Sequence, residues 1–307
     1  MKYRKLGKTA MHVSVVGVGT WQLGGEWGKT FEQAEVDAML GKAGDLGVNL
    51  IDTAECYGDH LSEELVGQAI KGRREKWIIA TKFGHKFKPN FERENLFEAA
   101  QVQRQLEDSL RALQTDYIDL YQFHSGTDEM LDTPGLWEML QKQVESGKIR
   151  HLGISISKKH GSLYQVEKAT DVGAAAIQAV YNRIHRKTER KIFDSCIRQK
   201  LGVLARVPLA SGFLSGKYSK DSKFTGTDVS SSWQDQDERQ EIFQEVANFK
   251  NEIPKGVTMA HWALAWCLQH PAVTCVIPGC KNAEQVESNA MAADLQAVRD
   301  DHPQAAL

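Results

Sequence analysis

Four side chains that can hold or move a proton stand at, or just after, the ends of apolar runs in the sequence. Asp52 closes the run VNLID, Lys82 closes WIIATK and His124 closes YIDLYQFH, while Tyr57 follows Asp52 by five positions. A charge at the end of a buried strand is costly unless it is paired, and Asp52 and Lys82 can pair with each other. A structural ion pair beside an unrelated tyrosine and a core histidine would explain each residue singly. We favour one functional set, because packing alone gives no reason for four such groups at one rim.

These residue types fit the polarisation of a carbonyl group. An ammonium next to a phenol stabilises the phenolate, so Lys82 is expected to lower the pKa of Tyr57 by about one to three units and make it a general acid. Asp52 would keep Lys82 charged and oriented, and a neutral His124 could donate a hydrogen bond to a substrate oxygen. The sequence contains no G-x-S-x-G, H-E-x-x-H or P-loop motif that would offer a competing chemistry.

A polarised carbonyl can be reduced only if a cofactor supplies the hydride, since no side chain can. The glycines of residues 17–22 do not form a Rossmann turn, because the third glycine of G-x-G-x-x-G falls on Gln22. A better phosphate site follows the last apolar run, where Asn282 and Gln285 are expected to cap a helix directly after Lys281. Taken alone, Lys281 is better explained as an ordinary solvated lysine than as a phosphate ligand.

Eight short runs rich in valine and isoleucine, each followed by a segment with helical periodicity, must position these residues. They span residues 13–19, 48–52, 77–82, 117–124, 150–155, 175–180, 202–207 and 273–279. The chain has no Pro- or Ser-rich linker between halves. The pattern therefore favours an α/β fold in which residues 1–307 form one domain, a (β/α)8 TIM barrel, rather than two doubly wound domains. In such barrels the working residues lie at the carboxyl ends of the strands.

The remaining segments are expected to close the barrel and shape its mouth. The first twelve residues, with a turn centred on Gly7, predict an N-terminal β-hairpin that closes the bottom of the barrel. The stretch from Pro208 to Trp233 is too long for an ordinary connection and is expected to cover a ligand. Long loops at the carboxyl-terminal face are expected to set the specificity, and they span residues 22–30, 84–94, 125–132 and 208–236.

Composition and charge exclude several classes of protein. The 307 residues contain 38 Lys and Arg against 40 Asp and Glu, a net charge of −2, which argues against binding to nucleic acid or to an anionic membrane. The sequence has no signal-peptide pattern and no apolar run of membrane-spanning length, so a cytoplasmic location is expected. The five cysteines form no paired C-x-x-C motifs, and of the ten histidines only His124 and His85 fall at strand ends. We therefore expect neither disulfides nor a metal centre, and a metal-dependent barrel hydrolase is not favoured.

The sequence resembles the aldo-keto reductases, in particular bacterial members that begin with YRKLGKT. The resemblance covers nearly the whole chain, and its most specific segments are GVGTWQLGG (17–25), GVNLIDTAECYGDHLSEELVG (47–67), IATK (79–82), DYIDLYQFH (116–124), SGKIRHLGIS (146–155), QAVYN (178–182), PLASGFLSGKY (208–218) and IPGCKNAEQVESN (277–289). It places the family's catalytic tetrad on the four residues chosen above, with Tyr57 as the proton donor. The implied activity is reduction of a small-molecule carbonyl substrate, an aldehyde or a ketone, by NADPH.

The resemblance also implies a set of residues that bind NADP(H) in an extended form. Gly19, Thr20, Trp21 and Asp52 would lie near the nicotinamide, with Ser155 and Gln178 on its carboxamide. The pyrophosphate segment would be Pro208, Leu209, Ser211, Gly212, Leu214, Gly216 and Lys217. At the other end, Gly279 and Lys281 would meet the 2′-phosphate, and Gln285 and Asn289 would lie near the adenine.

The chain departs from the family pattern at three places. Arg206 stands where many relatives place an aromatic side chain on the nicotinamide, and Ile156 stands where they often have asparagine. In the loop after Tyr57, His60 and Leu61 replace the usual glycine and histidine. No tetrad member is lost. A second hypothesis keeps the barrel and the cofactor but makes the protein a redox-sensing regulatory subunit, similar to the potassium-channel β subunits of the superfamily.

Overall fold

Eight parallel strands form the central barrel of the computed structural model, which describes every residue except 89–91, 158–161, 220–221, 223–235 and 307. The strands are β3 (Val18–Gly19), β4 (Leu50–Asp52), β5 (Ile78–Phe83), β8 (Ile118–His124), β9 (Ile149–Ser155), β10 (Ala174–Val180), β11 (Gly202–Arg206) and β12 (Cys275–Ile277). They are ordered β12-β11-β10-β9-β8-β5-β4-β3, and parallel bridges Val16–Val276 and Gly19–Gly279 join the two ends. All eight predicted strands are present, which confirms the TIM-barrel prediction.

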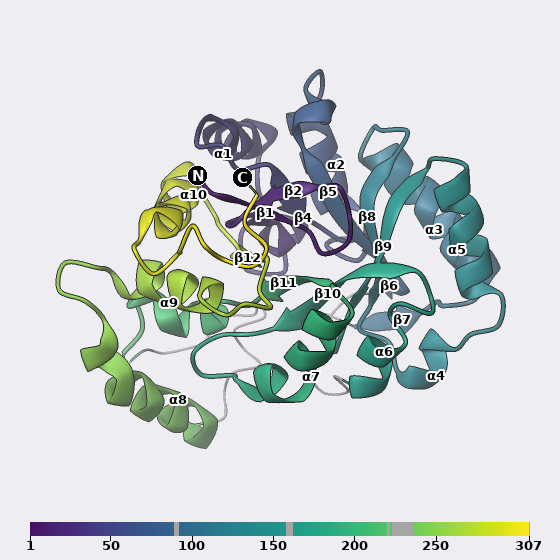
Figure 1. Ribbon diagram of the computed structural model, residues 1–307. Helices are drawn as coiled ribbons and strands as arrows, with labels where there is room; N and C mark the ends of the chain where they lie inside the picture. The colour runs from purple at the N-terminus through teal and green to yellow at the C-terminus, as the bar shows by residue number, and fades with distance from the viewer. Residues whose placement is uncertain (89–91, 158–161, 220–221, 223–235, 307) are drawn as a thin grey trace.

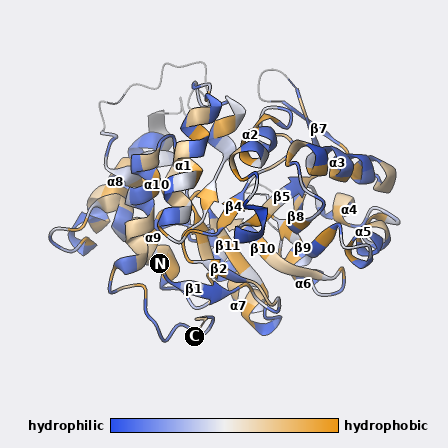
Figure 2. Cartoon of the chain, turned by 90° about the horizontal axis from the view of Figure 1, so that it is seen from above, coloured by the Kyte–Doolittle hydropathy of each residue, from blue (hydrophilic) through white to orange (hydrophobic). Residues whose placement is uncertain are grey.

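Helices surround the strands, as Figures 1 and 2 show from two directions. Helix α3 (Ala99–Ala112), for example, turns an apolar stripe inward, in which Val102, Leu106 and Leu110 are buried at helical spacing. The α-helices are α1 (Gln33–Asp45), α2 (Leu61–Ala69), α3 (Ala99–Ala112), α4 (Asp128–Leu131), α5 (Leu136–Glu145), α6 (Leu163–Glu167), α7 (Lys187–Arg198), α8 (Gln236–Phe249), α9 (Met259–Leu268) and α10 (Ala283–Ala290). Short 3₁₀ turns are η1 (Trp21–Gly24), η2 (Arg74–Lys76), η3 (Ala210–Ser215), η5 (Lys250–Glu252) and η6 (Met291–Asp294).

An antiparallel hairpin closes the floor of the barrel, as the sequence predicts. It pairs β1 (Tyr3–Lys5) with β2 (His12–Ser14). Leu6 and Val13 of the hairpin pack against inward-facing side chains of the barrel strands, which are Leu50, Ala80, Leu120, Ala176, Leu204 and Cys275. Gly7 has φ of +54°, and a Cβ there would lie 2.3 Å from the backbone nitrogen of Gly202, so only glycine fits this close approach.

The interior of the barrel changes from apolar to polar along the strands. Side chains two positions apart on a strand share a face, so the residues above the apolar layer also point inward. Those residues are Asp52, Lys82, Gln122, Gln178 and Arg206, two positions beyond Leu50, Ala80, Leu120, Ala176 and Leu204 respectively. The sequence therefore builds an apolar floor and a polar layer at the carboxyl ends of the strands.

All four expected loops contain secondary structure. The 3₁₀ turn η1 overlaps residues 22–30, and α4 lies within residues 125–132. Within residues 84–94 and just beyond, β6 (His85–Phe87) pairs with β7 (Arg93–Asn95) in an antiparallel hairpin. The stretch expected to cover a ligand contains η3, but half of it, including Trp233, lies outside the described residues. None of the helices in the described part of the chain has the length and apolarity needed to cross a bilayer.

Candidate active site

A buried ammonium joins three of the four sequence-predicted residues. Lys82 Nζ lies 2.8 Å from Asp52 Oδ2, 2.6 Å from the carbonyl oxygen of Thr53 and 3.3 Å from Tyr57 Oη. An ammonium has three protons, and these three acceptors use all of them. The Lys82 side chain has no exposed surface and that of Asp52 is only 5% exposed. Burial lowers the pKa of Lys82, but the charge of Asp52 and the contact with Tyr57 outweigh it, so the net pKa is raised and Lys82 stays charged.

Two buried amides hold the second oxygen of Asp52. Gln178 Nε2 donates to Asp52 Oδ1 over 2.6 Å, and Gln122 Nε2 donates to the same atom over 3.4 Å. Gln178 in turn accepts a hydrogen bond of 3.3 Å from Ser155 Oγ. The carboxylate is thereby fixed on both sides. Gln122 was not predicted from the sequence. Its position two residues before His124, on the same face of the strand, could have identified it as a site residue.

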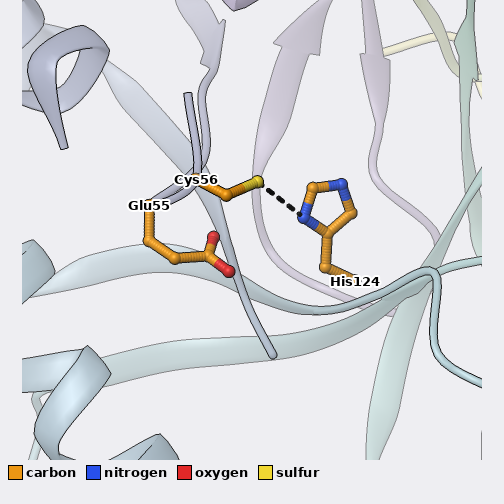
Figure 3. Close-up of side chains that lie close together, drawn as sticks. All are labelled: Glu55, Cys56 and His124. Atoms are coloured by element: carbon orange, nitrogen blue, oxygen red, sulfur yellow. Dashed lines mark hydrogen bonds between the residues drawn. The ribbon is translucent and has the colours of Figure 1, made fainter. Parts of the chain in front are cut away.

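His124 completes the set from the neighbouring strand end. Its ring meets the ring of Tyr57 edge-on, with 6.2 Å between centroids. Burial, reinforced by the charges of His85 and Lys82, holds the pKa of His124 well below its usual range, so the imidazole is neutral as expected. Cys56 Sγ lies 3.7 Å from His124 Nδ1 (Figure 3). Burial raises the pKa of the Cys56 thiol, so the thiol can donate to Nδ1, which leaves the ring proton on Nε2.

The pKa of Tyr57 differs from the sequence expectation. Burial raises it to about 12, and the charge of Lys82, which lowers it, offsets only part of that effect. The expected net lowering is therefore wrong, because desolvation of the phenolate outweighs the attraction of the ammonium. Tyr57 keeps its proton throughout the neutral range. Lys82 acts on the phenolate that forms when this proton leaves.

A cavity of about 400 Å³ opens beside Tyr57 and Asp52, a volume within the range of small-molecule sites. Most of the residues predicted to bind a cofactor line it: Gly19, Thr20, Trp21, Asp52, Gln178, Pro208, Leu209, Ser211, Gly212, Lys217, Gly279, Lys281, Gln285 and Asn289. Ser155, Leu214 and Gly216 are not among the lining residues, and neither are the buried Lys82 and the half-buried His124. Trp27 lines the cavity as well.

The far end of the cavity carries two lysines and the N-terminus of a helix. Asn282 caps α10, accepting a hydrogen bond of 2.9 Å from the backbone nitrogen of Gln285, as predicted. The Gln285 side chain accepts from the nitrogen of Lys281 over 2.9 Å, one position earlier than a capping box requires. Lys281 Nζ donates to the carbonyl oxygen of Trp27 over 3.1 Å. The cations of Lys281 and Lys217, together with a helix N-terminus, suit the phosphates of a dinucleotide.

The polar wall near Tyr57 also leaves atoms for a ligand. Arg206, at the end of β11, donates through Nη2 to the carbonyl oxygen of Ile156 over 3.0 Å. Its Nε, and Oε1 of Gln22, are buried and have no hydrogen-bond partner among the described residues. Burial lowers the pKa of Arg206, while the charges of Tyr57 and Asp52 raise it. The guanidinium therefore lies within electrostatic reach of Tyr57 and Asp52.

Comparisons with known proteins agree over nearly the full length. A profile of the Aldo/keto reductase family matches residues 15–305. The chain is 33% identical to aldo-keto reductase YhdN of Bacillus subtilis (strain 168) over 300 residues, covering 94% of this chain and 87% of that protein. It is 29% identical to a probable voltage-gated potassium channel subunit beta of Arabidopsis thaliana over 315 residues, covering 96% and 92%. The holo form of aldo-keto reductase AKR11C1 from Bacillus halodurans superposes with a TM-score of 0.81 at 29% identity, covering 99% of this chain and 94% of that one.

Proposed function

The chain belongs to the aldo/keto reductase family, and on that premise we propose that it reduces aldehydes or ketones to alcohols with NADPH. The observation that carries the proposal is the position of Lys82 Nζ, which contacts both Asp52 Oδ2 and Tyr57 Oη beside the cavity. A phenol that borders a cavity and contacts a buried ammonium can give up its proton to a ligand oxygen. A structural ion pair would not need the tyrosine.

The proton path follows from the contacts. Tyr57 Oη donates its proton to the carbonyl oxygen of the substrate, and Lys82 stabilises the phenolate that remains. Asp52 keeps Lys82 charged and fixes its direction, because Gln178 and Gln122 hold the other carboxylate oxygen. His124 is neutral, and Nε2 carries its proton, so this nitrogen donates a hydrogen bond to the same substrate oxygen. Two donors thus converge on the oxygen that gains negative charge.

The cavity residues would hold the cofactor, and NADPH supplies the hydride when bound. We propose that Gly19, Thr20 and Trp21 border the reacting end and that Ser155 and Gln178 orient it. The segment from Pro208 to Lys217 would bind the pyrophosphate. Lys281 and the N-terminus of α10 would bind a 2′-phosphate, which is the feature that favours NADPH over NADH. Gln285 and Asn289 would border the adenine.

Replacing Tyr57 with phenylalanine tests the proton-donor role. The variant should consume NADPH with an aldehyde about 10²- to 10⁴-fold more slowly than the wild type, the usual contribution of a positioned acid. Tyr121→Phe is the matched control, because the Tyr121 hydroxyl is buried and has no hydrogen-bond partner among the described residues. It should react at a near wild-type rate. A folded Tyr57→Phe variant that keeps most of the wild-type rate would show that another group donates the proton.

A second candidate function is a regulatory, redox-sensing subunit with little turnover, and the similarity to the potassium channel subunit beta favours it. The two functions differ in one readout. A panel of aldehydes, ketones and sugars assayed with NADPH in the absence of any partner protein should show steady turnover for a reductase. Tight NADPH binding without turnover on the whole panel would favour the regulatory function.

A further inference from the structure

Three potential metal ligands meet beside the proposed proton-transfer site. Glu55 and Cys56 lie in the turn that follows β4, and His124 ends β8. One ligand atom from each lies within 4.8 Å of the other two, and Figure 3 shows the carboxylate of Glu55 turned toward the sulfur and the imidazole. Sequence spacing cannot reveal this set, because Cys56 and His124 are 68 residues apart. The barrel brings them together, because β4 and β8 lie on either side of β5.

The distance between the sulfur of Cys56 and the Nδ1 nitrogen of His124 matches the distance between two ligand atoms of a tetrahedral zinc ion. Zinc lies about 2.3 Å from a thiolate sulfur and about 2.05 Å from an imidazole nitrogen, so at a tetrahedral angle the two ligand atoms are about 3.6 Å apart. Cys56 Sγ and His124 Nδ1 are 3.7 Å apart. An ion could enter between them without a change in the backbone.

The carboxylate provides an independent observation. Glu55 Oε1 accepts a hydrogen bond of 2.9 Å from the backbone nitrogen of His85. Its other oxygen, Oε2, is buried and has no hydrogen-bond partner among the described residues. Buried polar atoms are nearly always satisfied, so a partnerless carboxylate oxygen next to a thiol and an imidazole requires an explanation. A cation bound between the three groups would satisfy it.

The charges of the three groups balance those of a divalent ion. A thiolate, a carboxylate and a neutral imidazole carry two negative charges in total, which equals the charge of one divalent ion. The Arg93 side chain, which hydrogen-bonds Cys56, lies beside the three groups. Binding replaces the proton of the Cys56 thiol, which passes to solvent. A sulfur and a nitrogen ligand select a borderline ion of the zinc type rather than Mg²⁺ or Ca²⁺, which prefer oxygen.

We propose that Glu55, Cys56 and His124 bind one divalent cation of borderline softness, such as Zn²⁺, with a fourth position left to water. Coordination through Nδ1 keeps the ring proton of His124 on Nε2. The cation thus takes the place that the thiol proton of Cys56 has in the metal-free protein.

Titration of the full-length protein with Co²⁺ alone tests this site, because cobalt reports its ligands by absorption. One equivalent should produce the intense visible bands of a tetrahedral ion and a thiolate-to-cobalt band in the near ultraviolet, and Zn²⁺ should remove both by displacement. Cys56→Ala should abolish the near-ultraviolet band. Cys196→Ala, which removes a fully buried thiol of α7, is the matched control and should keep it.

Glu55→Gln keeps the shape of the side chain and removes its charge. It should weaken Zn²⁺ binding by at least about tenfold, measured by competition with a chromophoric chelator. Thermal unfolding of each metal-free variant separates loss of the ligand from loss of the fold. The proposal is wrong if the wild type binds no equivalent of Co²⁺ at micromolar concentrations. It is also wrong if the folded Cys56→Ala variant retains the thiolate band, or if folded Glu55→Gln binds Zn²⁺ as tightly as the wild type.

Discussion

Removing the ammonium of Lys82 should destabilise the protein by about 3–5 kcal/mol, because it leaves the carboxylate of Asp52 buried without its countercharge. The two groups are 2.8 Å apart, with 0% and 5% of the side chains exposed, so solvent can replace little of the lost attraction. The change also removes the donor to the carbonyl oxygen of Thr53, which adds to the loss. The amides of Gln178 and Gln122 still donate to Asp52 in the variant, which limits the loss of stability.

Lys82→Met keeps the length of the side chain and makes the expected loss measurable by urea unfolding, followed through tryptophan fluorescence. Adding Asp52→Asn should restore at least about half of the lost free energy of unfolding, since the neutral pair that results carries no unpaired charge. Lys148→Met is the control: its ion pair with Glu107 is exposed, with 40% and 44% of the side chains accessible, and should contribute less than about 1 kcal/mol. Neither variant that lacks Lys82 should recover reductase activity.

The reasoning would be refuted in two ways. If Lys82→Met destabilises the protein no more than Lys148→Met, Asp52 and Lys82 do not form a desolvated charged pair. If the double variant is as unstable as Lys82→Met or more so, an unpaired carboxylate is not the cause of the loss. A change in the slope of the unfolding free energy against urea would point instead to an altered denatured state.

Two further predictions concern the cofactor and the C-terminal segment. Lys281→Ala should weaken NADPH about 10- to 100-fold and NADH hardly at all, because only the 2′-phosphate loses a charge-assisted hydrogen bond; fluorescence titration measures both, and equal losses would contradict the assignment. Burial, reinforced by the charge of Arg4, lowers the pKa of His302 to about 4. As the pH falls, the unfolded chain therefore binds a proton at this group before the folded chain does. The folded protein loses the corresponding stability between about pH 6.5 and 4, by at most about 1.4 kcal/mol per pH unit. The free energy of unfolding should fall less steeply with acidification in His302→Asn, while His12→Asn, at an exposed position, should keep the wild-type slope; identical slopes for all three proteins would contradict the prediction.

The barrel was predictable because its strands are buried on both faces and read as separate apolar runs. Their polar ends identified Asp52, Lys82 and His124, since a parallel barrel places all strand ends of one kind at the same rim. The hairpin of the first residues was also predictable from its turn. Alternate residues of a strand point to the same side, so Gln122, two positions from both Leu120 and His124, could also have been predicted to point into the barrel.

Burial and neighbours across strands were not predictable. The pKa of Tyr57 depends on how completely the folded chain removes the phenol from water, which a spacing of residues does not encode. Similarly, the sequence around Glu55 and Cys56 does not show that His124 lies beside them. That contact depends on the arrangement of β4 and β8 on either side of β5. The short hairpin β6–β7 was expected as a loop, because its alternating polar residues lack a continuous apolar face.

The transfer of deuterium from NADPH to product tests the central claim most directly. The protein would be incubated with an aldehyde and NADPH carrying deuterium on the transferring face of nicotinamide carbon 4, each face being tested in turn. The account predicts that one labelled form gives an alcohol with deuterium on the former carbonyl carbon, and that Tyr57→Phe greatly slows its formation. An alcohol without deuterium from either form, or no NADPH-dependent alcohol from any aldehyde or ketone of the panel, would contradict it.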